Sequence, residues 1–116
     1  MAIKVVKEKI KLEEVKELAK EFYVSMIKGV VDIEKEIIAL GGEFHMDANI
    51  VLMENGSDQS DVWGFNIQLE KTPEDWLEYT SLINIRPALG NLSIEISDQK
   101  LRDKMKAIID TKIMLK

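Results

Sequence analysis

The sequence predicts an α+β fold: a mostly antiparallel meander sheet with an N-terminal and a C-terminal helix packed on one of its faces. Three observations predict it. β-branched or alternating segments fill the middle of the chain, apolar residues recur at helical spacing near each end, and turn signals separate the segments. Strands clustered between helices are typical of this class. A length of 116 residues predicts one domain, spanning 1–116.

The first third of the chain predicts a strand over 3–7, followed by a helix that starts at Leu12 and ends between Met26 and Lys28. The stretch that follows permits two interpretations. A single helix over 12–40 would be about 43 Å long, whereas a domain of this size is only about 35 Å across. Gly29 also interrupts the helical pattern. We therefore prefer a hairpin with arms at 29–33 and 37–41.

The middle of the chain continues with a bend at Gly41-Gly42 and then a strand over 43–48, in which polar and apolar residues alternate. The apolar run 50–53 suits either a central strand or a short helix. A turn follows at 55–57, and a half-buried strand follows over 65–69.

The last third predicts a hairpin and a helix. Strands over 77–86 and 91–96 bring their apolar faces together if Arg86 lies opposite Asn91, which also places Leu82 opposite Glu95. Ser97 or Asp98 caps the C-terminal helix. The inner stripe of that helix comprises Leu101, Met105, Ile108, Ile109 and Lys112 or Ile113.

Composition excludes several classes of function. With no cysteine, the chain has no disulfide, thiolate metal site or thiol nucleophile. A net charge of −5 argues against nucleic acid or an anionic membrane as partner. No apolar run approaches the ~18 residues of a membrane span, and we expect a cytoplasmic protein.

The candidate catalytic residues are His45, Asp47 and Arg86. His45 is the single histidine, and a carboxylate two residues later could hold its tautomer. The planar guanidinium of Arg86 suits a carboxylate or phosphate, although a structural arginine bound to loop carbonyls is the preferred alternative. The candidate ligand-binding residues are polar side chains on the strands of the predicted sheet: Glu43, Asn66, Asn84 and Ser93.

An acid-rich patch forms a further candidate. His45, Asp47 and Glu43 lie close in sequence to Asp32 and Glu34, and together they offer imidazole and carboxylate ligands to a divalent metal. Their spacing matches no zinc set or calcium loop. Solvated acidic surface is therefore the preferred interpretation, and we expect no metal and no other cofactor.

Several runs in the chain resemble a small bacterial and archaeal family of unknown function. They comprise 30–35, the run Gly-Gly-Glu-Phe-His-Met-Asp-Ala over 41–48, Asn-Gly-Ser over 55–57, Trp63-Gly64 with Asn66, and the run Ser-Leu-Ile-Asn-Ile-Arg-Pro over 81–87 leading to Gly90-Asn91. The resemblance covers roughly 3–113. It implies a stand-alone protein of about this size, and it carries no established activity and no catalytic roles.

Three hypotheses for function follow. The first is a structural or interaction domain that forms homo-oligomers, because self-association would cover exposed sheet edges. The second is a small-molecule or metal-assisted enzyme, which requires His45 and Asp47 to share one cleft with Asn84 and Arg86. The third is an RNA-acting, toxin-like factor, against which the acidic balance argues.

Overall fold

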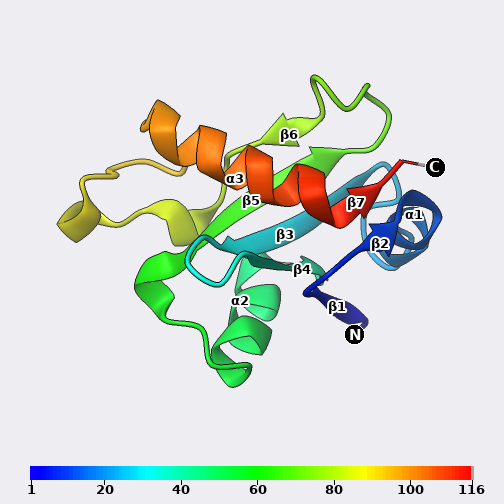
Figure 1. The fold of residues 1–116 in the computed structure, drawn as a ribbon, viewed down its shortest axis with the longest axis horizontal. Helices are drawn as coiled ribbons and strands as arrows, with labels where there is room; N and C mark the ends of the chain where they lie inside the picture. The colour runs from blue at the N-terminus through cyan, green and yellow to red at the C-terminus, as the bar shows by residue number, and fades with distance from the viewer. Residues whose placement is uncertain (116) are drawn as a thin grey trace.

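Five strands form one antiparallel sheet in the order β1-β4-β3-β5-β6 (Figure 1). The computed structural model describes residues 1–115. The strands of this sheet are β1 (Ile3–Val6), β3 (Met26–Asp32), β4 (Ile37–Gly41), β5 (Val62–Gln68) and β6 (Leu77–Glu78). The helices are α1 (Leu12–Ala19), α2 (His45–Glu54) and α3 (Gln99–Lys112). The predicted α+β class with an antiparallel meander is therefore confirmed.

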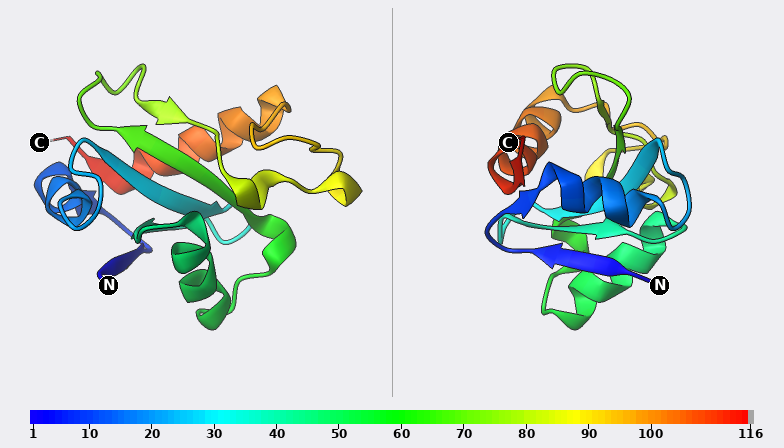
Figure 2. Two further views of the ribbon diagram at one scale, coloured as in Figure 1. Left: turned by 180° about the vertical axis from the view of Figure 1, so that it is seen from behind. Right: turned by 90° about the vertical axis from the view of Figure 1, so that its right-hand side faces the viewer.

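Helices cover both faces of this sheet (Figure 2). α1 and α3 lie on one face, as predicted, and close the larger core, which contains Val15, Phe65, Met105 and Ile109. α2 lies on the opposite face, where no helix was predicted. There a smaller core joins Val30, Ile37, Ala39 and Val62 of the sheet to Ala48 and Leu52 of the helix.

The predicted hairpin at 29–41 is confirmed, and the alternative of one long helix is wrong. β3 pairs with β4 from Gly29 opposite Leu40 to Asp32 opposite Ile37. The longest dimension of the molecule is 37 Å, which is shorter than the rejected helix. The carboxylate of Asp32 fixes the turn, since one of its oxygens accepts hydrogen bonds from the backbone N–H groups of Glu34 and Lys35, both at 2.9 Å.

The first helix is shorter than predicted, because α1 ends at Ala19. The carbonyl of Ala19 accepts from the N–H groups of Tyr23 and Val24 at 3.1 and 2.8 Å, which winds the chain away from the helix axis. Val24 adopts a left-handed conformation at φ 61°. The helix therefore ends before Met26, and Met26 and the residues after it form β3. The apolar spacing continues past Ala19, which is why the predicted helix is too long.

The predicted strand over 43–48 is wrong, because His45 begins helix α2. The Asp47 carboxylate reaches back and accepts hydrogen bonds from the N–H groups of Glu43 and Phe44 at 3.1 and 2.9 Å. It thereby satisfies donors at the start of the helix. The helical alternative for 50–53 is confirmed, since α2 continues to Glu54.

The predicted hairpin over 77–96 is largely wrong. Arg86 does pair with Asn91, but the next bridge joins Thr80 to Glu95, two residues out of the predicted register. Short 3-10 helices, Leu82–Asn84 and Pro87–Leu89, replace the regular ladder. The side-chain amide of Asn91 donates to three backbone carbonyls within this segment, so side chains perform the pairing that was expected of the backbone.

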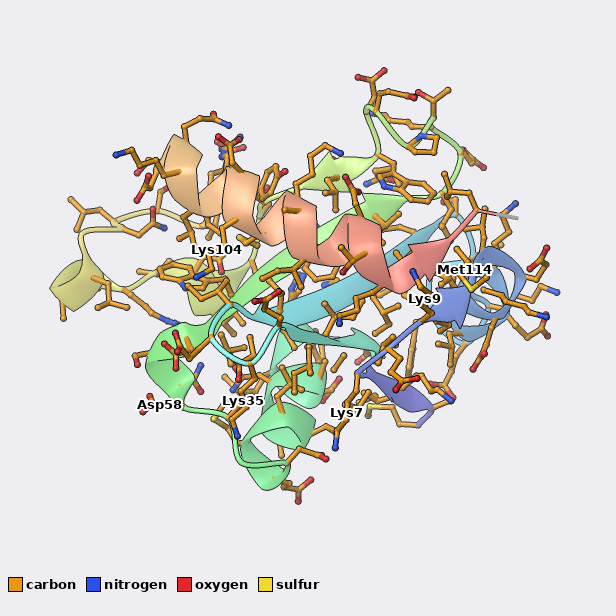
Figure 3. The ribbon with its side chains drawn as sticks, viewed as in Figure 1. Lys7, Lys9, Lys35, Asp58, Lys104 and Met114 are labelled. Carbon is orange, nitrogen blue, oxygen red and sulfur yellow. The ribbon has the colours of Figure 1, made fainter. Side chains whose placement is uncertain are left out.

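A two-stranded parallel pair joins the two ends of the described chain. β2 (Ile10–Lys11) lies beside β7 (Ile113–Met114), with Ile10 opposite Ile113. Figure 3 labels Lys9 and Met114 at this junction. The ammonium group of Lys9 donates to the Thr111 carbonyl at 3.2 Å. The side chain of Asp98 caps α3 through the N–H of Lys100 at 2.9 Å, as predicted.

Candidate functional site

A pocket of about 650 Å³ lies against the sheet face that carries α2. The start of α2 forms one wall, and the segment after β6 forms the opposite wall. β3 and β5 supply its polar floor through Lys28 and Asn66. The lining residues are Lys28, Phe44, His45, Met46, Asp47, Asn66, Thr80, Ser81, Leu82, Ile83 and Ile94. Its volume lies within the range of small-molecule sites, about 300–1,000 Å³.

Apolar side chains surround this pocket. Phe44 and Met46 on one side, with Leu82 and Ile94 on the other, are between 41% and 77% exposed. Large apolar side chains that remain exposed around a hollow mark a surface where burial by a ligand would be favourable. The pocket therefore combines an apolar rim with a polar floor.

His45 is buried at the start of α2, and its Nε2 lies 2.9 Å from the carbonyl oxygen of Phe65. A carbonyl can only accept, so the neutral ring carries its proton on Nε2 and exposes the lone pair of Nδ1. Burial lowers the pKa of His45, and the nearby Lys28 charge acts in the same direction, while Phe65 and Asn66 oppose them. The imidazole is therefore neutral at pH 7.

Asn66 presents an acceptor without a donor. Its Nδ2 group lies 3.3 Å from the Thr80 carbonyl and 3.4 Å from Oε1 of Glu78. Both partners accept, which fixes the orientation of the amide. Its Oδ1 is enclosed and has no hydrogen-bond partner among residues 1–115. Buried polar atoms of this kind are uncommon and call for a specific explanation.

Lys28 supplies the positive charge of the pocket. Its ammonium group lies 5.1 Å from the centre of the Tyr23 ring and 5.8 Å from that of Phe44, within the range of cation–π attraction. Within the described part of the chain, no carboxylate lies within ion-pair distance of it. The aromatic rings hold this cation beside the pocket without neutralising it.

The pocket contains three of the predicted site residues: His45, Asp47 and Asn66. Glu43 points to solvent outside it, and its backbone carbonyl accepts a hydrogen bond from the Tyr23 hydroxyl at 2.6 Å. Ser93 is also exposed, and its hydroxyl bonds with the backbone of Glu95. Asp47 lines the pocket, but one of its carboxylate oxygens is occupied by the cap of α2.

Asn84 and Arg86 do not line this pocket. The fully buried amide of Asn84 accepts from the N–H of Gly64 at 2.8 Å and donates to the Gly64 carbonyl at 3.1 Å. Arg86 donates to the carbonyls of Ile83, Gln59 and Val62. Its guanidinium stacks 4.7 Å from the centre of the Trp63 ring.

These two side chains occupy the outer edge of β5, where a neighbouring strand would otherwise lie. β6 covers that edge only at Asn66 and Ile67. Asn84 pairs with Gly64, and Arg86 binds the carbonyl of Val62, so the edge is completed by side chains. The structural interpretation of Arg86 therefore matches its contacts, and Arg86 does not line the pocket that contains His45.

The acid-rich patch does not assemble in space. Among residues 1–115, no group of three His, Asp or Glu side chains is placed to hold a metal ion. Asp32 is buried at the end of β3, where it accepts from the turn and from the Ser57 hydroxyl at 2.6 Å. Its carboxylate has a structural role at the hairpin turn.

Sequence reasoning missed Lys28 and the rim residues Phe44, Met46 and Leu82. The predicted helix ends between Met26 and Lys28, although Lys28 alternates with Val30 and Asp32 on one face of β3. That alternation is the available signal. Phe44 and Met46 belong to the apolar face of the predicted strand over 43–48, and no pattern indicates their exposure at the start of a helix.

His45 provides a testable pH dependence. Since its folded pKa lies below 6.5, the unfolded chain binds a proton that the folded chain does not between those two values. We therefore expect the free energy of unfolding to fall as the pH drops below 6.5, through the folded pKa. Histidine resonances followed by NMR should titrate below 6.5, and urea unfolding of His45→Gln should lack this part of the pH slope. A titration at or above 6.5 would contradict the assignment.

The fold and the pocket define a small α+β domain with a single buried histidine in an apolar-rimmed site. The chain matches a family model described as a protein of unknown function (DUF5674) over residues 4–112, and it belongs to that family. The resemblance to a family of unknown function is thus confirmed. No curated protein and no solved structure matches the chain. The described residues include no helix with the length and hydrophobicity needed to cross a membrane.

Proposed function

We propose that this protein binds a small organic molecule in the pocket between α2 and the segment that follows β6. The observation that carries the proposal is the hollow of about 650 Å³, in which an apolar rim surrounds a polar floor. The neutral imidazole of His45 and the ammonium group of Lys28 lie on the same lining and offer polar contacts of different kinds.

The binding energy in this proposal comes mainly from the rim. Phe44, Met46, Leu82 and Ile94 expose apolar surface that a ligand would remove from water. Burial of about 100 Å² of such surface favours association by roughly 2–3 kcal/mol before the entropic cost of binding is subtracted. The polar floor then selects among ligands of similar size, since unpaired buried groups penalise an imperfect match.

Met46→Asp tests this function. Met46 lies in the first turn of α2, where the helix dipole favours an acidic side chain, so the variant should fold. We expect apolar fragments screened by NMR to shift signals of His45, Asn66 and 80–83, and Met46→Asp to weaken their binding about tenfold.

Ile50→Asp is the matched control. Ile50 is half-exposed on the same helix and does not line the pocket, so the same change of side chain should alter fragment affinity less than twofold. Equal losses in the two variants, or a screen without any fragment bound at millimolar concentration, would refute the proposed function.

A second candidate function is self-association through the segment 82–94, for which we propose a cytoplasmic location of the protein. Five large apolar side chains are exposed there: Leu82, Ile85, Leu89, Leu92 and Ile94. Exposed apolar groups at this density favour an interface. We expect sedimentation equilibrium between about 10 and 500 μM to detect a dimer that Leu89→Ser and Leu92→Ser weaken. A monomer across that range would exclude this candidate.

A further inference from the structure

On the basis of the proposed pocket function, we infer that the ligand class is an organic monocarboxylate with an apolar body and an O–H or N–H donor. Two groups on the lining point to this class: the cation of Lys28, which has no carboxylate partner among residues 1–115, and the acceptor Nδ1 of His45, since the other ring nitrogen holds the proton.

The charge of Lys28 calls for an anion. Cation–π contacts with Tyr23 and Phe44 hold its ammonium group at the pocket, and no carboxylate among residues 1–115 pairs with it. A ligand carboxylate would form a charge-assisted hydrogen bond there. A positively charged ligand would meet like-charge repulsion at this position.

The free acceptor on the lining calls for a donor. Nδ1 of His45 has a free lone pair, since the proton on Nε2 is directed at the Phe65 carbonyl. A hydroxyl or N–H of the ligand satisfies the floor, whereas a purely hydrocarbon ligand leaves it unpaired.

The number of charges limits the ligand to one negative group. Lys28 is the only cation among the lining residues, and Asp47 lines the same pocket with a carboxylate. Glu78 also approaches the Asn66 amide from the side of β6. A phosphate monoester or a dicarboxylate would bring a second negative charge with no cation to meet it, so a monocarboxylate fits best.

Three probes separate these requirements: 3-phenyllactate, which has the carboxylate and a hydroxyl; 3-phenylpropionate, which lacks the hydroxyl; and methyl 3-phenyllactate, which lacks the charge. NMR titration of the full chain at pH 7.5 should show 3-phenyllactate binding about tenfold more tightly than either analogue. The shifted signals should include His45, Asn66 and Lys28.

Lys28→Met and Lys71→Met complete the experiment. Lys28→Met should weaken 3-phenyllactate about tenfold and leave the methyl ester unchanged, whereas Lys71→Met, an exposed site outside the pocket, should affect neither. If the ester or 3-phenylpropionate binds as tightly as 3-phenyllactate, or both variants behave alike, this ligand class is overturned. Apolar fragments that still bind in the pocket would then leave the proposed function standing, and their failure to bind would remove that function as well.

Discussion

Replacement of Asn84 by alanine is expected to lower the free energy of unfolding by about 3 kcal/mol, because it leaves buried backbone groups of β5 without partners. The amide holds both the N–H and the carbonyl of Gly64, and it also lies within 3.4 Å of the Tyr79 and Ile94 carbonyls. Asn84 is fully buried, so water cannot easily replace it. Thermal unfolding should show the midpoint falling by about 12 °C.

Asn84→Asp and Asn55→Ala sharpen this test. Asn84→Asp keeps the acceptor for the Gly64 N–H but turns an oxygen toward the Gly64 carbonyl, so it should destabilise at least as much as alanine. Asn55 is an exposed residue whose amide bonds the Val51 carbonyl at 2.8 Å, and its replacement by alanine should cost less than about 1 kcal/mol. Equal effects at Asn84 and Asn55 would show that the amide of Asn84 is not a structural element of the sheet edge.

Replacement of Arg86 by lysine is expected to cost about 2 kcal/mol of stability, although the charge is kept. The planar guanidinium donates to three carbonyls in different directions and stacks on Trp63, which a single ammonium group cannot reproduce. Burial lowers the pKa of Arg86, but an arginine remains charged at pH 7. Urea unfolding monitored by tryptophan fluorescence measures the loss.

Arg102→Lys is the graded control for this substitution. Arg102 also stacks on an aromatic ring, Tyr79, but its guanidinium donates to one carbonyl, that of Ile96. We expect a loss of about 1 kcal/mol or less there. If Arg86→Lys proved as stable as the original protein, the three carbonyl contacts would contribute nothing to the free energy of unfolding. Arg86 would then again be a candidate for ligand binding.

The sequence predicted those elements whose information is local. The hairpin at β3–β4 was recognisable because its length, Gly29 and a polar turn all agreed, and Asp32 reinforces that turn by hydrogen bonds within three residues. The strand β5 and the helix α3 were recognisable for the same reason, since Phe65 and Ile67 alternate with polar residues and the apolar residues of α3 recur at helical spacing.

The elements that were missed depend on side chains bonding to backbone. In 43–48, alternation predicted a strand, but the cap that Asp47 forms with Glu43 and Phe44 decides in favour of a helix. In 77–96, a matching apolar register predicted a ladder, but Asn84 and Asn91 take over the backbone hydrogen bonds. Spacing patterns indicate which residues are buried. They contain no information on which polar side chains form the backbone hydrogen bonds that a neighbouring strand would otherwise make.

The sequence analysis selected some residues that line the pocket and others that bond the backbone. His45, Asp47 and Asn66 were selected as polar residues among apolar ones, and all three line the pocket. Asn84 and Arg86 were selected by the same criterion, yet their polar groups face the backbone of β5 and neighbouring carbonyls. A polar residue within an apolar segment therefore indicates a side chain with a hydrogen-bond partner. The sequence pattern does not distinguish a partner in the chain itself from a ligand.

The edge of β5 closed by Asn84 and Arg86 also bears on aggregation. The segment Val62–Gln68 combines β-branched and aromatic residues with no charge and no proline, a composition that pairs readily with strands of other molecules when its edge is free. Many proteins protect such an edge with lysine, proline or a covering helix. Here two side chains from one loop occupy the hydrogen-bonding groups, so opening of that loop would offer β5 to a second chain while the rest of the fold remains intact.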